Sequence, residues 1–317
     1  MSTYKVVKYQ PGYKLVWDAF VKHSKNATFL FHRDFMEYHQ DRFEDYSLLV
    51  FKENNVVALL PANVTEHIVY SHQGLTYGGL ILADGIEESL LENIQNEIFS
   101  YLKNDRVKYL VVKVLPEIYS SEAKHCLKIY SKNNNHVVEN QNMVLAIDYN
   151  SDFKIHKTKL KRFKKLDSSF RIKEGRSELV NFWNALLVPR LKEKYQSKPV
   201  HSLSEIEYLQ SKFKNEIVQY NIYKDESLLA GITIFIKGKT VKSQYGIASV
   251  EGEKNYALDI LFVYLIEKFR NEGKQYFSMG TVNNSSELGY SKGMLKQKQE
   301  FGCRVYMQDV IKITVDD

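Results

Sequence analysis

Apolar and polar positions follow one order along the chain, and that order occurs twice. In each half, apolar residues at a helical spacing come first, and short continuous apolar runs of the kind that form strands follow them. A further helix, a strand, another helix and a last strand complete each half. The pattern therefore predicts an α+β fold of two similar units, each with a mixed, mostly antiparallel sheet flanked by helices.

The first unit is predicted to span residues 1–153. The pair Asn54-Asn55 separates two apolar runs and predicts a hairpin turn, because asparagine tolerates a positive φ. The expected helices are 13–24, 35–45, 87–103 and 120–130, and the expected strands are 47–52, 56–63, 67–72, 80–83, 109–114 and 143–147.

The second unit is predicted to span residues 154–317. Ser202 and Glu205 stand three positions apart at the start of an amphipathic stretch, which is a capping-box signature. The expected helices are 178–195, 202–212, 256–271 and 288–301, and the expected strands are 218–223, 228–236, 241–247, 275–279 and 304–314.

A length of 317 residues agrees with two domains on the usual size of a domain. The two cysteines, Cys126 and Cys303, lack the spacing of a disulfide framework or a zinc site, so we expect no metal. The first residues lack an apolar core, and no apolar run is long enough to span a bilayer. We therefore expect a cytoplasmic protein that does not enter membranes.

The formal charge of +6 is concentrated in residues 154–173, KIHKTKLKRFKKLDSSFRIK. A basic block of this kind attracts a phosphate-bearing ligand, an acidic partner or nucleic acid. A solvated connecting helix is the alternative interpretation, because charge runs usually have that role.

Three segments carry a resemblance to a known family: SHQGLTYGGLIL, QYGIAS and FSMGTVNNSSELGYSKGMLKQKQEFG. Together with the order of elements, they resemble the double-GNAT proteins of the Fem-like (FemABX-related) group. Within that group the chain is most similar to bacterial N-acyltransferases that act on nucleotide-linked amino sugars. The resemblance implies two tandem GNAT-like domains, with acceptor recognition in the first and acyl-coenzyme A binding in the second.

The implied reaction moves an acyl group from acyl-CoA to an amino sugar on a nucleotide diphosphate by direct attack, without a covalent enzyme intermediate. A dTDP-amino-deoxyhexose used for surface polysaccharide such as the O-antigen of lipopolysaccharide is the expected acceptor. A Fem-like transferase that takes its amino acid from aminoacyl-tRNA is the first alternative. A noncatalytic nucleic-acid-binding module is the second. The oligomeric state is left open, with a homodimer as one option.

Amide formation from a thioester needs a base for the amine, a donor for the oxyanion and an acid for the thiolate. His201 is the expected base, because histidine titrates near neutral pH. Tyr245 is expected to share one strand face with Val241 and Ser243, so its hydroxyl could protonate the thiolate. By the resemblance, a backbone amide near Gly246 meets the oxyanion, although a bulge or strand end is an equal explanation for this glycine.

The expected cofactor site follows that strand. The family's pyrophosphate loop is usually richer in glycine than this stretch, so side chains have to supplement its amides. The helix N-terminus at residue 256 would favour a phosphate, whereas Glu251 and Glu253 oppose it. Asn283 and Asn284 could bind pantetheine or cap the next helix. The full expected set is Ile247, Ser249, Gly252, Lys254, Asn255, Asn283 and Asn284.

The expected acceptor site lies in the first unit. His72, Gln73 and Tyr77 occupy a glycine-rich loop, where side chains of these types can bind sugar hydroxyls or a pyrimidine. A mobile hairpin tip is the alternative. Lys298 is expected to supply positive charge for a nucleotide diphosphate, although a solvated lysine is the commoner outcome.

Overall fold

The computed structural model describes residues 4–86, 88–120 and 136–315. The chain divides into two compact units, Met1–Asn142 with Met307–Asp317, and Met143–Tyr306. The sequence placed a single boundary after residue 153, whereas the final strand returns to the first unit because it pairs with β8 there. The helix predicted at 120–130, beyond its first residue, and Cys126 lie outside the described residues.

The first unit contains two sets of paired strands. One set has the order β1-β3-β4-β7, and the other has the order β2-β5-β6-β8, with the last residues of β15 antiparallel to β8. The bounds are β1 Tyr4–Lys8, β2 Glu44–Asp45, β3 Leu48–Lys52, β4 Asn55–Leu60, β5 Asn63–Thr65, β6 Ile68–Tyr70, β7 Ile81–Leu82, β8 Tyr109–Lys113 and β15 Arg304–Thr314.

The helices of the first unit are α1 Lys14–His23, α2 Arg33–Met36 and α3 Glu88–Asn104. Ile94 and Leu102 of α3 pack with Leu48 and Val112 in one apolar core. The helix predicted at 35–45 is wrong beyond its first turn, because a 3-10 turn at Glu37–His39 and the edge strand β2 follow α2. At the first hairpin, Glu53 and not an asparagine takes the positive φ.

The second unit contains one sheet with the order β10-β11-β12-β13-β14, continued by the end of β9. All pairs are antiparallel except β13 with β14, which is parallel. Strand β10, which overlaps the end of the basic stretch, was not predicted. The bounds are β9 His136–Asp148, β10 Phe170–Glu174, β11 Ile217–Lys224, β12 Ser227–Lys237, β13 Thr240–Ala248 and β14 Tyr276–Thr281.

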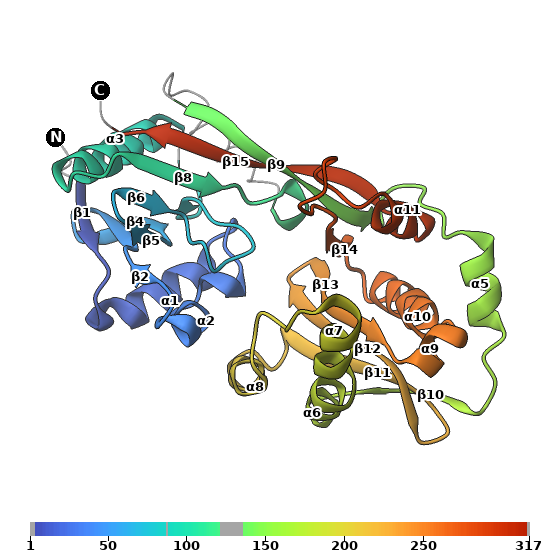
Figure 1. Ribbon diagram of the computed structural model, residues 1–317. Coiled ribbons are helices and arrows are strands. Elements are labelled where there is room, and N and C mark those ends of the chain that lie inside the picture. Colours follow the sequence, from blue (N-terminus) through green and yellow to red (C-terminus); the bar gives the residue numbers. More distant parts are fainter. Residues whose placement is uncertain (1–3, 87, 121–135, 316–317) are drawn as a thin grey trace. The chain divides into compact units, whose positions relative to one another are not determined.

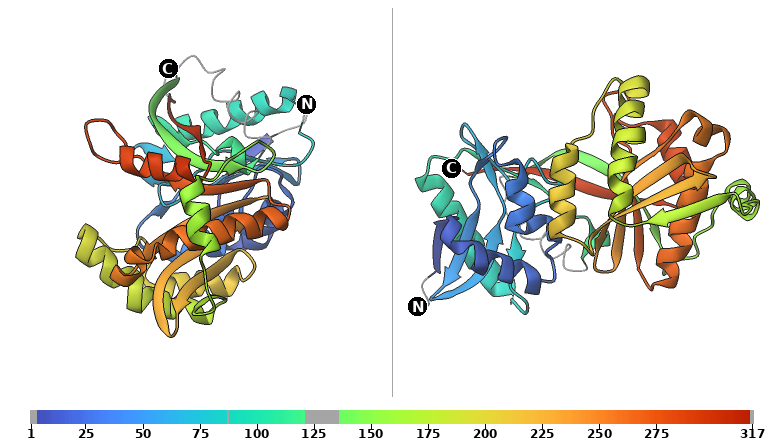
Figure 2. Two further views of the ribbon diagram at one scale, coloured as in Figure 1. Left: turned by 90° about the vertical axis from the view of Figure 1, so that its right-hand side faces the viewer. Right: turned by 90° about the horizontal axis from the view of Figure 1, so that it is seen from below.

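Helices cover both faces of this sheet (Figure 1; Figure 2). A Cβ at Gly231 of β12 would meet Phe182 of the π segment. Gly246 of β13 pairs with the next residue of β12, so its Cβ would point to the opposite face, where it would meet Phe262 of α10. The π segment and α10 therefore lie on opposite faces of the sheet. The predicted helix 178–195 consists of α6, a π-helical segment and α7. The bounds are α5 Lys157–Lys164, α6 Ser177–Asn181, the π segment Phe182–Leu187, α7 Val188–Tyr195, α8 Leu203–Lys212, α9 Val250–Lys254, α10 Ala257–Asn271 and α11 Lys292–Glu300.

The predicted α+β class is therefore confirmed, with mostly antiparallel sheets flanked by helices. The meander predicted at 218–247 is the β11-β12-β13 segment, and the capping box at Ser202 and Glu205 is present. These local features were predictable because each depends on a spacing or a cap that the sequence shows directly.

Candidate active site

Strands β13 and β14 pair over a short distance and then diverge. Their parallel register runs from Thr240 opposite Tyr276 to Lys242 opposite Ser278. Beyond it β13 continues to Ala248, whereas β14 turns to pair with Val144 of β9. The later part of β13 therefore has β12 on one side, and on the other side no strand of the described residues pairs with it. We call this side the open edge of β13, residues Gln244–Ala248.

The backbone amide of Gly246 points to the open edge. The N–H of Ser249 donates to the carbonyl of Leu229 on β12 at 2.8 Å. Amides alternate in direction along an antiparallel pair, so the N–H groups of Gly246 and Ala248 point away from β12. The carbonyl of Ala248 accepts a hydrogen bond from Arg190 Nε at 3.2 Å on that side, as the alternation requires. The Gly246 amide is thus a donor that β12 does not use.

A β-bulge precedes Tyr245. Thr233 pairs with Tyr245 and Ile234 pairs with Ser243, so Gln244 is an extra residue on β13. The prediction that Tyr245 and Ser243 share one face is wrong, because the bulge shifts the alternation by one residue and places them on opposite faces. The Oε1 atom of Gln244 is buried, and no described residue provides it with a hydrogen-bond partner.

The two side chains predicted to be catalytic lie in contact, although they are far apart in the sequence. His201 Nδ1 lies 2.5 Å from the Tyr245 hydroxyl oxygen, and the backbone N–H of His201 donates to the same oxygen at 3.3 Å. His201 precedes the N-cap of α8, and its residue is only 4% exposed. Trp183 of the π segment packs edge-to-face on Tyr245 with ring centroids 5.0 Å apart.

Burial raises the pKa of Tyr245 to about 12, so its hydroxyl is protonated at neutral pH. Because the backbone N–H already donates to the Tyr245 oxygen, the hydroxyl proton can lie toward His201 Nδ1. The two side chains form a hydrogen-bonded pair, and Tyr245 directly precedes Gly246 in the chain.

The loop that was expected to bind the cofactor uses its polar groups internally. Ser249 Oγ accepts the Gly252 N–H at 2.9 Å as an N-cap. A Cβ at Gly252 would lie 2.0 Å from the carbonyl oxygen of Leu229, so close packing requires this glycine. Asn255 Nδ2 donates to the carbonyl and the side chain of Glu251. Ile247 is buried, and Lys254 is exposed.

Acidic side chains surround the start of α10. Asp259 lies in its first turn and accepts from Lys159 and Arg162 of α5 at 3.1 and 2.8 Å. Glu253 of α9 pairs with Arg190 and Lys194. Part of the basic stretch thus anchors α5 on α10, while Lys157, Lys161, Lys164 and Lys165 remain exposed.

Asn283 and Asn284 shape the loop before α11. Asn283 Oδ1 accepts the N–H of Met143 at 2.8 Å, and Asn284 Oδ1 accepts from Ser286. The helix cap is Ser291, whose hydroxyl accepts the Met294 N–H. Capping by either asparagine, one of the two interpretations, therefore does not occur.

Lys298 of α11 is buried under the same loop. Its Nζ donates to the carbonyl of Thr281 at 2.8 Å, and burial lowers its pKa to about 8. The ammonium group therefore supports the end of β14 and is not displayed on the surface.

In the first unit, Tyr77 and His72 are packed side chains. Tyr77 is 2% exposed and lies between the rings of Phe31 and Tyr119, and burial raises its pKa well above the usual range. His72 has a positive φ, and its Nδ1 accepts the Gly74 N–H at 3.2 Å. Gln73 is exposed, with its side chain bonded to Asn63 at 2.8 Å.

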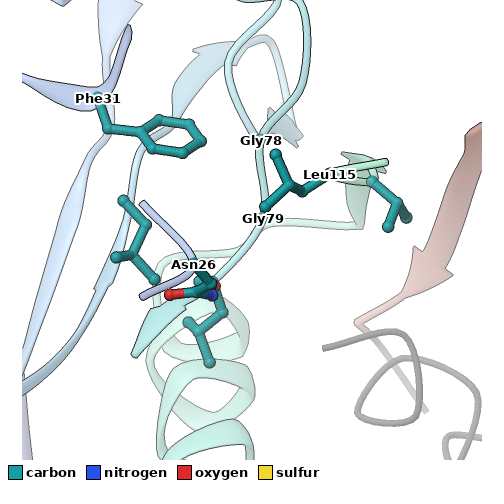
Figure 3. Close-up of a pocket in the computed structure, with 8 residues that line it drawn as sticks. Asn26, Phe31, Gly78, Gly79 and Leu115 are labelled. Atoms are coloured by element: carbon teal, nitrogen blue, oxygen red, sulfur yellow. The ribbon is translucent and has the colours of Figure 1, made fainter. Parts of the chain in front are cut away.

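The glycines of this loop are needed for packing. A Cβ at Gly78 would lie 1.6 Å from the carbonyl oxygen of Ser71. The cavity beside Gly78 and Gly79, with Asn26 and Phe31 facing it, holds about 10 Å³ (Figure 3). That volume admits at most a single water molecule, so it cannot take a sugar.

Among the described residues, no group of three or more His, Cys, Asp and Glu side chains could hold a metal ion. A search of the same part of the chain finds no helix long and apolar enough to cross a membrane. The neighbours of the pair, Trp183, Arg190 and Gln244, were not predicted. Their positions depend on a π-helical segment, on the approach of α7 to β13 and on a β-bulge, none of which the sequence signals.

No protein-family model matches the sequence, and no curated protein matches it. Solved structures share its fold. FemX aligns over 96% of this chain and 96% of its own with a TM-score of 0.66 and 11% identity. The C-terminal domain of a putative lysylphosphatidylglycerol synthetase from Agrobacterium fabrum aligns over 96% of this chain and 92% of its own, with a TM-score of 0.61 and 8% identity. L-PGS from Bacillus licheniformis aligns over 98% of this chain and 93% of its own, with a TM-score of 0.57 and 11% identity. The chain therefore shares its fold with FemX and with these two synthetase structures.

Proposed function

We propose that the chain transfers an acyl group to an amine by direct attack at the open edge of β13. The observation that carries the proposal is the Gly246 amide, which points away from β12 beside the bonded pair Tyr245 and His201. An uncommitted backbone donor at a strand edge suits a carbonyl whose oxygen becomes negative during the reaction. The fold shared with FemX supports the same reaction class.

The chemistry follows from these groups. The amine attacks the carbonyl carbon, and the Gly246 N–H donates to the developing oxyanion. The Tyr245 oxygen accepts the proton that the amine loses while its own hydroxyl proton moves to His201 Nδ1. Return of that proton through Tyr245 to the departing group completes the transfer, and a tyrosinate never accumulates because its pKa lies near 12.

The finer proposal keeps acyl-CoA as the donor and a nucleotide-linked amino sugar as the acceptor, with a dTDP-amino-deoxyhexose as the first compound to test. The Gly246 amide, which would bind the carbonyl oxygen, is compatible with a thioester donor of this kind. The loop Ser249–Asn255 would leave the pyrophosphate to exposed groups such as Lys254, because its other polar atoms bond within the loop.

A second candidate donor is aminoacyl-tRNA. The observation that favours it is the row of exposed lysines Lys157, Lys161, Lys164 and Lys165, together with Glu251 and Glu253 where a pyrophosphate was expected. Exposed lysines attract an RNA backbone, and carboxylates repel a diphosphate. Two of the structures that share the fold are named as lysylphosphatidylglycerol synthetases or L-PGS, which supports testing lysine as the transferred group.

The test compares both donors with the purified chain. Thiol release from acyl-CoA with the nucleotide-linked amino sugar supports the first donor, and amide formation from aminoacyl-tRNA, followed by mass spectrometry, supports the second. Tyr245→Phe should lower turnover about hundredfold in whichever assay succeeds. The matched control Tyr195→Phe, at an exposed ring, should leave turnover unchanged. Transfer at the wild-type rate in Tyr245→Phe would remove the pair from the mechanism.

A further inference from the structure

A cavity of about 440 Å³ lies in the first unit, apart from any group used in the acyl-transfer proposal. Its walls come from the segment before α1, from α2 and the turn after it, from β2 and from the glycine-rich loop. The volume lies within the range of small-molecule sites. The lining residues are Tyr9, Pro11, Arg33, Met36, Glu37, Gln40, Phe43, Glu44, Asp45 and His72.

The one cation among the residues that line this cavity, Arg33, is bonded to three neighbouring side chains. Arg33 donates from Nε to Glu37 at 2.9 Å, from Nη1 to Ser47 at 3.2 Å, and from Nη2 to Asp45. Its guanidinium lies 3.6 Å from the ring centre of Tyr9, and the residue is 2% exposed. Arg33 therefore organises the wall, and its positive charge is balanced by Glu37 and Asp45.

The wall carries more negative than positive charge. Three carboxylates, Glu37, Glu44 and Asp45, line the cavity with one guanidinium. Glu44 is exposed and makes no ion pair among the described residues, and Glu37 uses one oxygen, Oε1, for both Arg33 and Tyr9. Uncompensated carboxylates beside a cavity attract a cation, and they raise the cost of placing an anion there.

His72 gives the cavity a hydrogen-bond donor, whereas the carboxylates are acceptors. Its side chain is buried, and burial together with the neighbouring His39 lowers its pKa to about 3, so the ring is neutral. Because Nδ1 accepts the Gly74 N–H, the ring proton resides on Nε2. Nε2 has no hydrogen-bond partner among the described residues, and His72 lines the cavity. The cavity wall thus offers one neutral N–H donor in addition to its carboxylates.

We propose that this cavity binds a primary ammonium compound that carries a neutral oxygen acceptor close to the nitrogen. The ammonium group lies against Glu44 and Glu37, and the oxygen accepts from His72 Nε2. The side chains of Met36 and Phe43 cover the carbon skeleton. An amino sugar and the amide of an amino acid both have this chemistry. The inference stands on binding alone and does not require the acyl-transfer proposal.

Calorimetry with the full chain tests the inference without any acyl donor. Glucosamine and L-alaninamide are the two probes, and their N-acetylated forms are the uncharged controls. We expect each amine to bind at least about tenfold more tightly than its acetylated form, and added salt to weaken the amine selectively. The tighter amine identifies the sugar or the amino acid as the source. Equal affinity for amine and acetylated form, or no binding by either amine, overturns the proposal.

A variant pair separates this wall from general surface charge. Glu44→Gln should weaken amine binding about fivefold, as expected for one exposed carboxylate. Glu97→Gln, at an exposed position of α3, should leave binding unchanged. Glu44 is exposed and its strand pairing with Val64 uses the backbone, so its replacement leaves the fold intact. Unchanged affinity in Glu44→Gln would also overturn the proposal. If the wild-type chain binds the amine but transfers no acyl group, only the acyl-transfer proposal is contradicted.

Discussion

Two glycine-containing segments of this chain differ in what requires the glycine. In the first unit, Gly78 passes so close to Ser71 that a Cβ would lie 1.6 Å from a carbonyl oxygen. In the second unit, a Cβ at Gly246 would sit at least 3.6 Å from its neighbours, which is ordinary contact. The first glycine is needed for the fold, whereas packing within the chain does not explain the second.

The same distinction applies to polar groups. Ser249, Asn255, Asn284 and Lys298 each bond to the backbone or to side chains of their own loops. The Gly246 amide and His72 Nε2 have no such partner in the described residues. A polar group that the fold leaves unused is a better guide to a ligand than one that merely belongs to a suitable residue type.

The largest expected effect is the loss of stability in Gly78→Ala. The new methyl group would meet a backbone oxygen that β8 holds in place, so we expect the free energy of unfolding to fall by about 3 kcal/mol or more. Denaturant unfolding measures it. Gly12→Ala, where nothing lies within 4 Å, is the control and should change stability by less than about 0.5 kcal/mol. Similar values for the two variants would show that the loop relaxes freely.

The next effect is a change in pH dependence caused by His72→Asn. The folded pKa of about 3 lies below the unfolded value, so wild-type stability falls as pH drops through the window from 6.5 to 3. Asparagine tolerates the positive φ and does not titrate there. Between pH 7.5 and pH 4.5 the variant should lose about 2 kcal/mol less stability than the wild type. Parallel curves for the two proteins would refute a buried neutral histidine.

A smaller effect of opposite sign is expected from Lys298→Met. The folded pKa of about 8 lies below the unfolded value, so the buried ammonium destabilises the fold at neutral pH, and wild-type stability rises as pH increases from 8 toward 10.5. Replacement by an apolar side chain should raise the free energy of unfolding by about 1 kcal/mol at pH 7, after loss of the bond to Thr281. The gain should disappear near pH 10, and a gain independent of pH would point to packing alone.

The smallest effect on stability is expected from Gly246→Ala. Its methyl group fits beside Ile232 and Phe262, so the free energy of unfolding should change by less than about 1 kcal/mol. Turnover in the acyl-transfer assay should nevertheless fall about tenfold, because the methyl group narrows the approach to the amide. Full activity in a stable Gly246→Ala variant would mean that no ligand approaches Gly246. Gly246 would then have no functional role to set it apart from Gly78.

Local patterns accounted for much of the fold. The meander β11-β12-β13, the helices α8 and α10 and the capping box at Ser202 followed from spacing and capping chemistry. The sequence failed where neighbours in space decide the outcome. The apolar run after Arg33 has a helical spacing, yet the helix ends at Met36, and Asp45 lies on the edge strand β2, where it pairs with Arg33.

The candidate site was predictable in its residue types and unpredictable in its geometry. His201 and Tyr245 could be selected because their chemistry suits proton transfer, and their contact at 2.5 Å depends on strand pairing and on α8 approaching β13. The face of Tyr245 could not be predicted, because the extra residue Gln244 becomes a bulge only against β12. The cavity around Glu44 was missed because its wall joins segments that are far apart along the chain.

The sequence by itself determined the order of elements, the two-unit α+β class and the residues able to carry chemistry, because apolar periodicity and caps act over a few neighbouring residues. Only the tertiary structure decided which polar groups remain unused. Strand register sets the direction of the Gly246 amide, and packing fixes the tautomer of His72. Both depend on contacts between distant segments, since a hydrogen-bonding group becomes available to a ligand only after the fold has satisfied all the others.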